Sequence, residues 1–414
     1  MQNHADVLIV GAGSAGMAAA VGAARCGVQV EMLDRNAYPG GKATAAMVGT
    51  VCGLYHCSPE EEAKWAVGGF AREFASALAE KSKSKPVQFY NRLHFLPYDI
   101  HSFRELSEGL LKEHGVKVRY QSEVRAVATN DGFVENVQTD SGDILGTGQT
   151  QFIDCSGESV LSFLTGKDWV RAEENQAAAR VFKLEGIASM PADALPFALG
   201  MALRKGLNSG ELAQDLALLS VVQGTYRNGS SYFKLPLSDE VTNDAKQRAA
   251  MLKSSGEQIK TVVDYLRKAS VAFADARISE MAPEVGFRTG FSPIGQVILS
   301  ADDVLNARRY PDGVAVGAWP IEFWRPGKQA EMQWLEDGES YHIPAGALTS
   351  AHAKNLYFAG RNLSADAMAQ ASARVMGTCL QTGYAVGVLA AYASLGKPRN
   401  EAIARIRKDL EINN

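Results

Sequence analysis

The chain has 414 residues, of which 46% are apolar and 21% are charged. This composition is typical of a folded protein with a large core, and it excludes a disordered chain. The 42 basic and 46 acidic residues leave a net charge of −4, which disfavours a sequence-independent nucleic-acid binder. Five scattered cysteines without a paired CxxC motif exclude a disulfide-based secreted scaffold and predict no metal site. We therefore expect a cytoplasmic protein.

The first predicted elements are a strand, a helix and a second strand. Residues 5–10 are almost continuously apolar, as expected for a strand buried on both faces. Small residues then predict a helix from Ser14 to about Cys26, and a strand follows at residues 28–33. The apolar run of residues 7–24 does not predict a membrane span, because it contains four glycines and follows no basic segment.

The middle of the chain alternates between clear and weak patterns. The next predicted elements are a helix and four strands, at residues 102–113, 116–120, 123–129, 134–139 and from 152 onwards. Residues 170–330 give the weakest pattern, apart from a long helix predicted over residues 242–276. We interpret the basic residues of that helix as a solvated face, with docking of a partner as the alternative.

The end of the chain returns to the pattern of its beginning. A strand is predicted at residues 356–359 and a helix at residues 377–395, which Gly396 and Pro398 terminate. The two chain ends therefore have the elements of one domain, and the stretch between them is predicted to form an insertion.

A glycine-rich fingerprint joins the first strand to the first helix. The sequence from Gly11 to Gly16 reads G-x-G-x-x-G, and Asp34 ends the following strand. The first glycine permits a tight turn, the second lets the backbone approach a pyrophosphate, and the third lets the helix pack closely on the strand. The start of the helix attracts phosphate, and an acid at this distance binds ribose hydroxyls. The fingerprint predicts a dinucleotide site without separating NAD from FAD.

Other segments favour FAD. Together with the fingerprint, the turns at residues 39–41, 154–157 and 358–361 resemble the glutathione-reductase-type fold, in which distant segments close around one FAD. Over nearly its whole length the chain more closely resembles the FAD-dependent oxidoreductase family. The segments that carry this second resemblance, in this order, are residues 40–44, 68–73, 152–157, 285–288, 299–303 and 358–378.

The resemblance implies an α/β fold: a Rossmann-like FAD-binding domain formed from both chain ends, with an inserted α+β substrate domain. The expected boundaries are residues 1–95 for the first FAD-binding part, 96–165 for a second part with a β-meander, 166–340 for the substrate domain and 341–414 for the third FAD-binding part.

The resemblance also implies which residues hold the cofactor. The residues expected at the FAD phosphates belong to the fingerprint: Gly11, Gly13, Ser14, Ala15 and Gly16. The other expected cofactor-binding residues are Asp34 and Arg35 at the adenosine, Gly41 and Lys42 near the pyrophosphate, Val124 at the adenine, Gly157, Gly360 and Arg361 beside the cofactor, and Gly377 and Thr378 at the last long helix. The positive end of that helix would favour the negative charge of a reduced flavin.

Three positions depart from the family pattern near the flavin or the substrate. Arg361 occurs where the wider fold usually has Asp, and Phe291 occurs where relatives have a second Arg. Asp366 occurs where relatives commonly have His. The chemistry of the relatives therefore does not transfer automatically to this chain.

The candidates for catalysis are one histidine and three charged residues. His56 is a candidate general base, with a packing role as the alternative. Arg288 matches a family arginine and is expected to contact a substrate anion or the flavin, or else to pair with Glu284. Asp366 and Arg374 either line the pocket or form a surface salt bridge.

Cysteine and tryptophan residues add two further alternatives. Cys52 and Cys57 have the C-x4-C spacing of a redox disulfide, although two buried residues beside the flavin are the interpretation we favour. Trp319, Trp324 and Trp334 either wall a substrate site or, as we favour, form the core of the substrate domain.

We therefore expect an FAD-dependent oxidoreductase whose bound flavin oxidises a substrate by hydride or electron transfer. No second G-x-G-x-x-G is present for a nicotinamide cofactor. One alternative is a flavin monooxygenase that acts on a small molecule, or on a protein side chain during maturation of a quinone-cofactor enzyme. Another is an FAD-bearing assembly factor with little turnover. The expected partner is a small molecule, with a protein substrate or an electron-transfer protein as the alternative.

Overall fold

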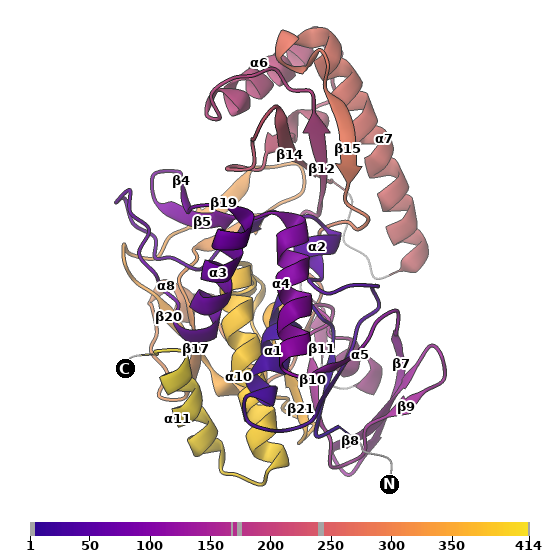
Figure 1. Ribbon diagram of the computed structural model, residues 1–414, viewed down its shortest axis with the longest axis vertical. Coiled ribbons are helices and arrows are strands. Elements are labelled where there is room, and N and C mark those ends of the chain that lie inside the picture. Colours follow the sequence, from indigo (N-terminus) through magenta and orange to yellow (C-terminus); the bar gives the residue numbers. More distant parts are fainter. Residues whose placement is uncertain (1–4, 167–168, 172–175, 239–243, 413–414) are drawn as a thin grey trace.

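A five-stranded parallel sheet forms the centre of the molecule (Figure 1). The computed structural model describes residues 5–166, 169–171, 176–238 and 244–412. The strands of this sheet, in spatial order, are β21 (Leu356–Phe358), β10 (Gln151–Asp154), β1 (Val7–Val10), β2 (Val30–Leu33) and β6 (Lys117–Arg119). Strands from both ends of the chain belong to this sheet, with β10 between β21 and β1, which confirms the predicted α/β, Rossmann-like fold.

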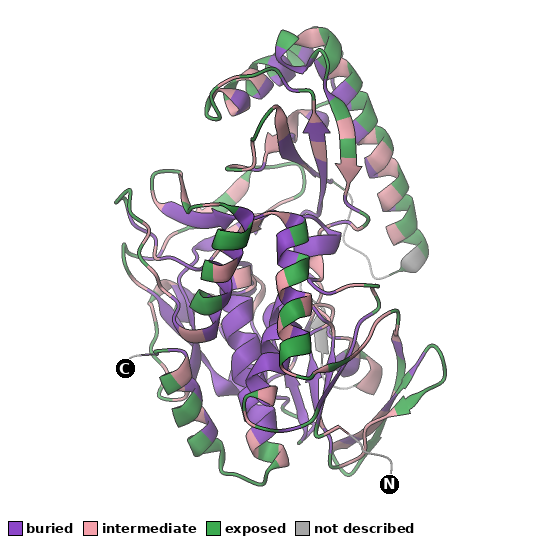
Figure 2. Cartoon of the chain, in the orientation of Figure 1, coloured by how far each residue is buried: buried purple, intermediate pink, exposed green. Residues whose placement is uncertain are grey.

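Helices α1 (Ser14–Ala24) and α10 (Met376–Ser394) pack tightly together. Most of their residues are buried (Figure 2). A Cβ atom on Gly383 would lie only 2.1 Å from the carbonyl oxygen of Ala15, so no larger residue fits at this crossing. This close contact fixes the start of α1 relative to the start of α10.

Further elements surround this centre. The helices are α2 (Lys42–Ala45), α3 (Gly69–Ser82), α4 (Ile100–Glu113), α5 (Val160–Thr165), α8 (Ala301–Leu305), α9 (Ala367–Ala373) and α11 (Arg399–Asp409). The β-meander expected in the second FAD-binding part consists of β7 (Val124–Asn130), β8 (Phe133–Thr139) and β9 (Ile144–Leu145). The sequence patterns did not predict α11, because its apolar stripe consists of little more than Ala402 and Ile406.

A second sheet lies at the top of Figure 1 and is antiparallel. Its strands, in spatial order, are β13 (Ser220–Val221), β14 (Ser230–Pro236), β12 (Ala179–Glu185) and β15 (Arg277–Met281). Helices α6 (Ala194–Ser209) and α7 (Ala245–Ala269) pack against it around a core of its own that includes Phe182 and Phe233. This unit confirms an α+β insertion.

Helix α7 is shorter than the sequence pattern predicted. Its predicted start at Thr242 lies outside the described residues, and Asp244 caps the helix by accepting the N–H of Gln247. The helix ends at Ala269 because Ser270 is extended. The solvated face is confirmed for most of its basic residues, which are exposed; Arg248 is half-buried and turns inward.

Residues after the insertion return to the main body. The remaining strands are β3 (Thr50–Val51), β4 (Val87–Phe89), β5 (Leu93–Pro97), β11 (Trp169–Arg171), β16 (Phe291–Pro293), β17 (Gly313–Gly317), β18 (Ile321–Trp324), β19 (Ala330–Gln333) and β20 (Tyr341–Pro344). Val314, Ile321 and Tyr341 belong to the same core as α1 and α10. If these residues are assigned to the main body, the inserted domain is shorter than the predicted residues 166–340. The domain boundaries stay a prediction. No described helix is both long and apolar enough to cross a membrane.

Candidate functional site

One cavity of about 1240 Å³ extends from the central sheet to the insertion. At one end it is lined by Gly11, Asp34, Gly157 and Gly360, which follow the strands β1, β2, β10 and β21. The carboxyl ends of parallel strands are the usual place for a ligand in this architecture. Pockets for one drug-sized ligand occupy about 300–1,000 Å³, so this cavity has room for a dinucleotide and a second molecule.

The loop at the start of α1 leaves space for phosphate groups. A Cβ atom on Gly13 would meet nothing closer than the Cα of Gly41, 3.9 Å away. By contrast, a Cβ atom on Gly16 would lie 1.8 Å from the carbonyl oxygen of Gly11, so this glycine is required for packing. Helix α1 has no capping side chain and no acid in its first turn. Its positive end is therefore available to an anion.

Asp34 is held rigidly beside this loop. One carboxylate oxygen accepts the N–H of Ala12 at 2.6 Å, and the other accepts the N–H of Asn36 at 2.7 Å. Burial raises the pKa of Asp34, and these two hydrogen bonds act in the opposite direction. Asp34 and Val124 both line the cavity, as a ribose-binding acid and an adenine contact require.

Six charged residues gather beside the same end of the cavity, and we call them the paired cluster. Its members are Arg35, Lys42, Arg248, Arg361, Glu158 and Glu284. Glu158 lies 2.9 Å from Arg248, 3.5 Å from Arg35 and 3.9 Å from Arg361. Burial alone would raise the pKa of Glu158, but these three guanidinium groups lower it to about 2.

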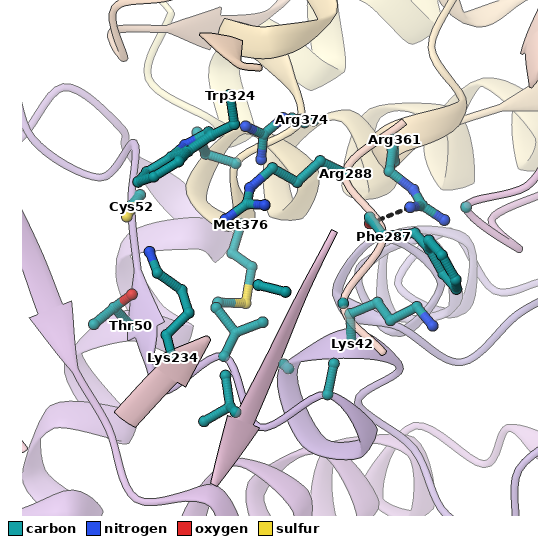
Figure 3. A pocket seen from close by; sticks show the side chains of 18 of the residues that line it. Lys42, Thr50, Cys52, Lys234, Phe287, Arg288, Trp324, Arg361, Arg374 and Met376 are labelled. Atoms are coloured by element: carbon teal, nitrogen blue, oxygen red, sulfur yellow. Dashed lines mark hydrogen bonds between the residues drawn. The ribbon is translucent and has the colours of Figure 1, made fainter. Parts of the chain in front are cut away.

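The paired cluster surrounds the ring of Phe287. The guanidinium of Arg361 donates to the backbone carbonyl of Phe287 (Figure 3). The ammonium of Lys42 lies 5.6 Å from the centre of the Phe287 ring and 2.5 Å from the carboxylate of Glu284. These contacts fix long cationic side chains at the cavity wall.

The other end of the cavity has a second group of cations, which we call the unpaired cluster: Lys234, Arg288 and Arg374 (Figure 3). Among the described residues, none of the three has a carboxylate within 4.0 Å. Trp324 covers two of them, with the Lys234 ammonium 4.5 Å and the Arg288 guanidinium 4.7 Å from the centre of its ring.

Amide and carbonyl groups supply the hydrogen bonds of this cluster. Arg374 donates to the side-chain oxygen of Gln176 at 3.0 Å and to the backbone carbonyl of Glu322 at 3.3 Å. The carboxylate of Glu322 accepts the indole N–H of Trp319 at 3.0 Å. Arg288 donates to the backbone carbonyl of Ala177.

Mutual repulsion and burial change the acidity of these groups. Burial, reinforced by the charge of Arg288, lowers the pKa of Lys234 to about 8. Burial, reinforced by Arg374, lowers the pKa of Arg288 to about 9. Burial also lowers the pKa of Arg374. With pKa values of about 8 and about 9, Lys234 and Arg288 are still mainly protonated at neutral pH, so this end of the cavity is positively charged.

A comparison with protein families identifies the family of the chain. The family model described as FAD dependent oxidoreductase matches residues 6–410. The chain belongs to the FAD-dependent oxidoreductase family. The expected cofactor, FAD, and the expectation of an enzyme are thereby confirmed.

Solved structures share the fold of this oxidoreductase at low identity. A geranylgeranyl bacteriochlorophyll reductase-like protein from Thermoplasma acidophilum is 12% identical with a TM-score of 0.47, over 98% of this chain and 82% of that one. The flavin-dependent brominase Bmp2 is 12% identical with a TM-score of 0.49, over 98% and 83%. BexE, studied for oxidation during BE-7585A biosynthesis, is 14% identical with a TM-score of 0.51, over 98% and 65%. No curated protein gave a match.

In this family member, most of the residues predicted to bind FAD line the cavity. They are Gly11, Gly13, Ser14, Ala15, Asp34, Arg35, Gly41, Lys42, Val124, Gly157, Gly360 and Arg361. Three others lie behind its wall: Gly16 is covered by Gly11, the N–H of Gly377 donates to the carbonyl of Cys52, and Thr378 is fully buried. Met376 lines the cavity where α10 begins.

The four catalytic candidates of the oxidoreductase separate into two pairs. Arg288 and Arg374 line the cavity, and Glu284, the alternative partner of Arg288, pairs with Lys42 and Arg35 instead. His56 lies outside the lining, with its ring 3.3 Å from the carbonyl of Glu339; burial lowers its pKa.

Asp366 also lies outside the lining, and it neither faces the pocket nor forms a surface salt bridge. It caps α9 by accepting the N–H of Ala369 at 2.7 Å, and its second oxygen accepts the N–H of Ala301 at 2.8 Å. We therefore assign no catalytic role to His56 or Asp366.

The cysteines agree with the interpretation we favoured in being free thiols, although only one of them lines the cavity, and the tryptophans depart from theirs. Cys52 lines the cavity, whereas Cys57 packs beneath Trp319, and both are free thiols. Burial raises the pKa of each thiol to about 12, so neither is a reactive thiolate. All three tryptophans line the cavity, although only the core interpretation was favoured; Trp319 serves both roles, because it is buried and lines the wall.

Three important residues were not predicted. Lys234 interrupts the apolar sequence Tyr-Phe-Lys-Leu-Pro of β14, and this interruption was the available signal. Glu158 and Arg248 meet across 90 residues of sequence, which no local pattern reveals. Among the described residues no group of acids, histidines and cysteines could hold a metal ion.

Proposed function

We propose that this enzyme oxidises a small organic molecule in the inner chamber, the part of the cavity walled by the unpaired cluster and Trp324. The observation that supports this is the continuity of the cavity, which joins the phosphate-binding loop at Gly13 to Lys234 in the insertion. Bound FAD supplies a two-electron oxidant, and the protein supplies binding, orientation and electrostatics.

The residues at the sheet end would hold the dinucleotide. The start of α1, with Gly13 and Ser14, would bind phosphate oxygens through backbone N–H groups. Asp34 would accept ribose hydroxyls, and Arg361 would lie beside the cofactor. These assignments follow from the geometry of the lining and from the family.

The residues of the inner chamber would orient the substrate and exclude water. The side chains of Trp324 and Met376 line the cavity beside the unpaired cluster and give this part of the wall an apolar surface (Figure 3). Arg288, Arg374 and Lys234 hold a positive potential there, which favours the gain of negative charge during the reaction. The start of α10 acts in the same direction, because no side chain caps it.

Substitution of Gly13 tests the cofactor site. The space around its Cα accepts a side chain without a clash in the protein, so Gly13→Val should fold but fill the phosphate site. We expect FAD affinity to fall by about ten- to a hundredfold, as overpacking of 1–3 kcal/mol predicts. Gly109→Val, on an open face of α4, is the matched control. Fluorescence of released FAD and circular dichroism measure binding and folding; equal FAD content in both variants would contradict the site.

Anaerobic mixing tests the reaction. Bleaching of the flavin spectrum by an organic donor in the absence of oxygen supports direct oxidation. Reduction by NADH or NADPH only, followed by substrate-dependent oxygen uptake, would instead establish the monooxygenase alternative. A flavin that neither an organic donor nor a nicotinamide reduces would establish the assembly-factor alternative. The monooxygenase result and the assembly-factor result would each overturn the proposal.

A further inference from the structure

We propose that the inner chamber recognises an organic carboxylate with an apolar body, bound by Arg288, Arg374 and Lys234. This inference rests on the proposed function, because it names the substrate class of the same site. It starts from a chemical imbalance: the chamber offers hydrogen-bond donors and positive charge without matching acceptors.

The imbalance is visible atom by atom. The Nε of Arg374, a residue that lines the cavity, has no hydrogen-bond partner in the described structure. The Lys234 ammonium faces the ring of Trp324 and has no described acceptor within hydrogen-bond distance. Arg288 uses one of its guanidinium nitrogens on the carbonyl of Ala177. A ligand here must supply acceptors, and an ionised carboxylate is acceptor-only.

The balance of charge leads to the same conclusion. Glu322 is the acid of this end of the cavity, and its carboxylate is used by the indole of Trp319. Three cations and one acid leave an excess of two positive charges in a half-buried space. Buried charges without partners are unfavourable, so their retention indicates a ligand that neutralises them. Guanidinium groups suit a carboxylate because both are planar and can form two parallel hydrogen bonds.

The remaining walls are apolar, which favours a carboxylic acid with an apolar body over inorganic phosphate as the ligand. Leu199 and Leu203 of α6, Val181 of β12, Val222 and Met332 line the same cavity. Because β13 pairs with Lys234 and α6 packs against β13, this apolar wall follows directly from the cationic end. The expected ligand therefore has a carboxylate head at the cations and an apolar body towards α6.

Matched acids and amides test this inference on the FAD-loaded enzyme. Benzoate and phenylacetate are titrated against benzamide and phenylacetamide, with inorganic phosphate as a separate probe. Binding is followed by the flavin difference spectrum and by calorimetry. We expect the acids to bind at least about tenfold more tightly than the amides, as one charge-assisted hydrogen bond predicts. Amides that bind as well as acids, or phosphate that binds as well as benzoate, would overturn the inference.

Three variants and one control test whether the preference for the acid depends on the unpaired cluster. Arg374→Gln and Lys234→Met should each reduce the preference for the acid by about tenfold, and Arg374→Lys should restore part of it. Arg277→Gln removes an exposed cation paired with Glu185 and should leave the preference unchanged. An acid preference that survives in both Arg374→Gln and Lys234→Met would refute the assignment. Calorimetry does not require the flavin, so an enzyme that selects benzoate but whose flavin no organic donor bleaches would contradict only the proposed function.

Discussion

The two clusters of cations lie beside one cavity, but only one of them includes acids within contact distance among the described residues. In the paired cluster, Glu158 lies within 4.0 Å of three guanidinium groups, and Glu284 lies within 4.0 Å of Arg35 and Lys42. In the unpaired cluster, Lys234 and its neighbours contact an indole, an amide and backbone carbonyls. Buried cations with their own acids are held in place by the protein, whereas those without acids are available to neutralise a ligand.

The pKa shifts of the two clusters differ in the same way. Both clusters are partly buried, and burial disfavours the charged form of each group. For Glu158, three neighbouring cations outweigh burial and the pKa falls to about 2. For Lys234, the neighbouring cations add to the effect of burial and the pKa falls to about 8. The charged form is therefore stabilised in the first case and destabilised in the second.

Removal of the central acid from the paired cluster should have the largest effect on stability. Glu158→Gln would remove the carboxylate that the guanidinium groups of Arg35, Arg248 and Arg361 share. Because loss of one partner of a buried ion pair leaves uncompensated charge, we expect the free energy of unfolding to fall by about 3 kcal/mol. Denaturant titration of the FAD-loaded protein measures this value.

The matched control is Glu108→Gln, which removes one partner of an exposed ion pair with Arg104 on α4. An exposed pair of this kind contributes about 0.3–0.5 kcal/mol. A loss of stability in Glu158→Gln no larger than in this control would show that the paired cluster is not a structural unit.

The sequence predicted the parts of the molecule that depend on local patterns. The strands at both chain ends, the fingerprint at Gly11 to Gly16 and the position of Asp34 beside it each follow from short segments with a known periodicity or spacing. These features bring most of the residues predicted to bind the dinucleotide to the cavity wall, and their roles there stay a prediction. The single lysine in β14 was also visible in the sequence, but its meaning depended on the other residues of the chamber.

The clusters themselves could not be predicted, because they join residues far apart in the sequence. Arg248 belongs to a regular basic helix and only the fold turns it towards Glu158. Arg374 lies 198 residues from Gln176, its amide partner. Whether a cation is paired or unpaired is a property of the folded cavity, so sequence alone left Arg288 open between a substrate contact and an ion pair.

Removal of one charge from the unpaired cluster should change the free energy of unfolding less than Glu158→Gln does, and should raise it. Lys234→Met keeps the length of the side chain and removes one of three mutually repelling charges. We expect the free energy of unfolding at pH 7 to rise by about 1 kcal/mol, since replacing a buried charge by an apolar group is often neutral or stabilising. Denaturant titration checks it, with Arg277→Gln as an exposed control that should change little. A destabilised Lys234→Met variant would mean that the lysine has a counter-charge in the folded protein.

The smallest expected effect is the pH dependence of the stability gained in Lys234→Met, which reports the pKa of this lysine. The pKa of Lys234 falls from its ordinary value of 10.5 to about 8 in the folded protein. Between these values the unfolded state binds more protons than the folded state, so the stability contributed by this group rises with pH. The destabilising effect is complete below pH 8 and disappears as the pH approaches 10.5. The advantage of Lys234→Met over the unmodified enzyme, about 1 kcal/mol at pH 7, should therefore be largely lost by pH 9. Unfolding titrations of both proteins at pH 7, 8 and 9 measure this difference, in which the other titrating groups cancel. An advantage that stays constant over this range would show that Lys234 keeps its ordinary pKa, and the two clusters would then not differ in the way their charges are held.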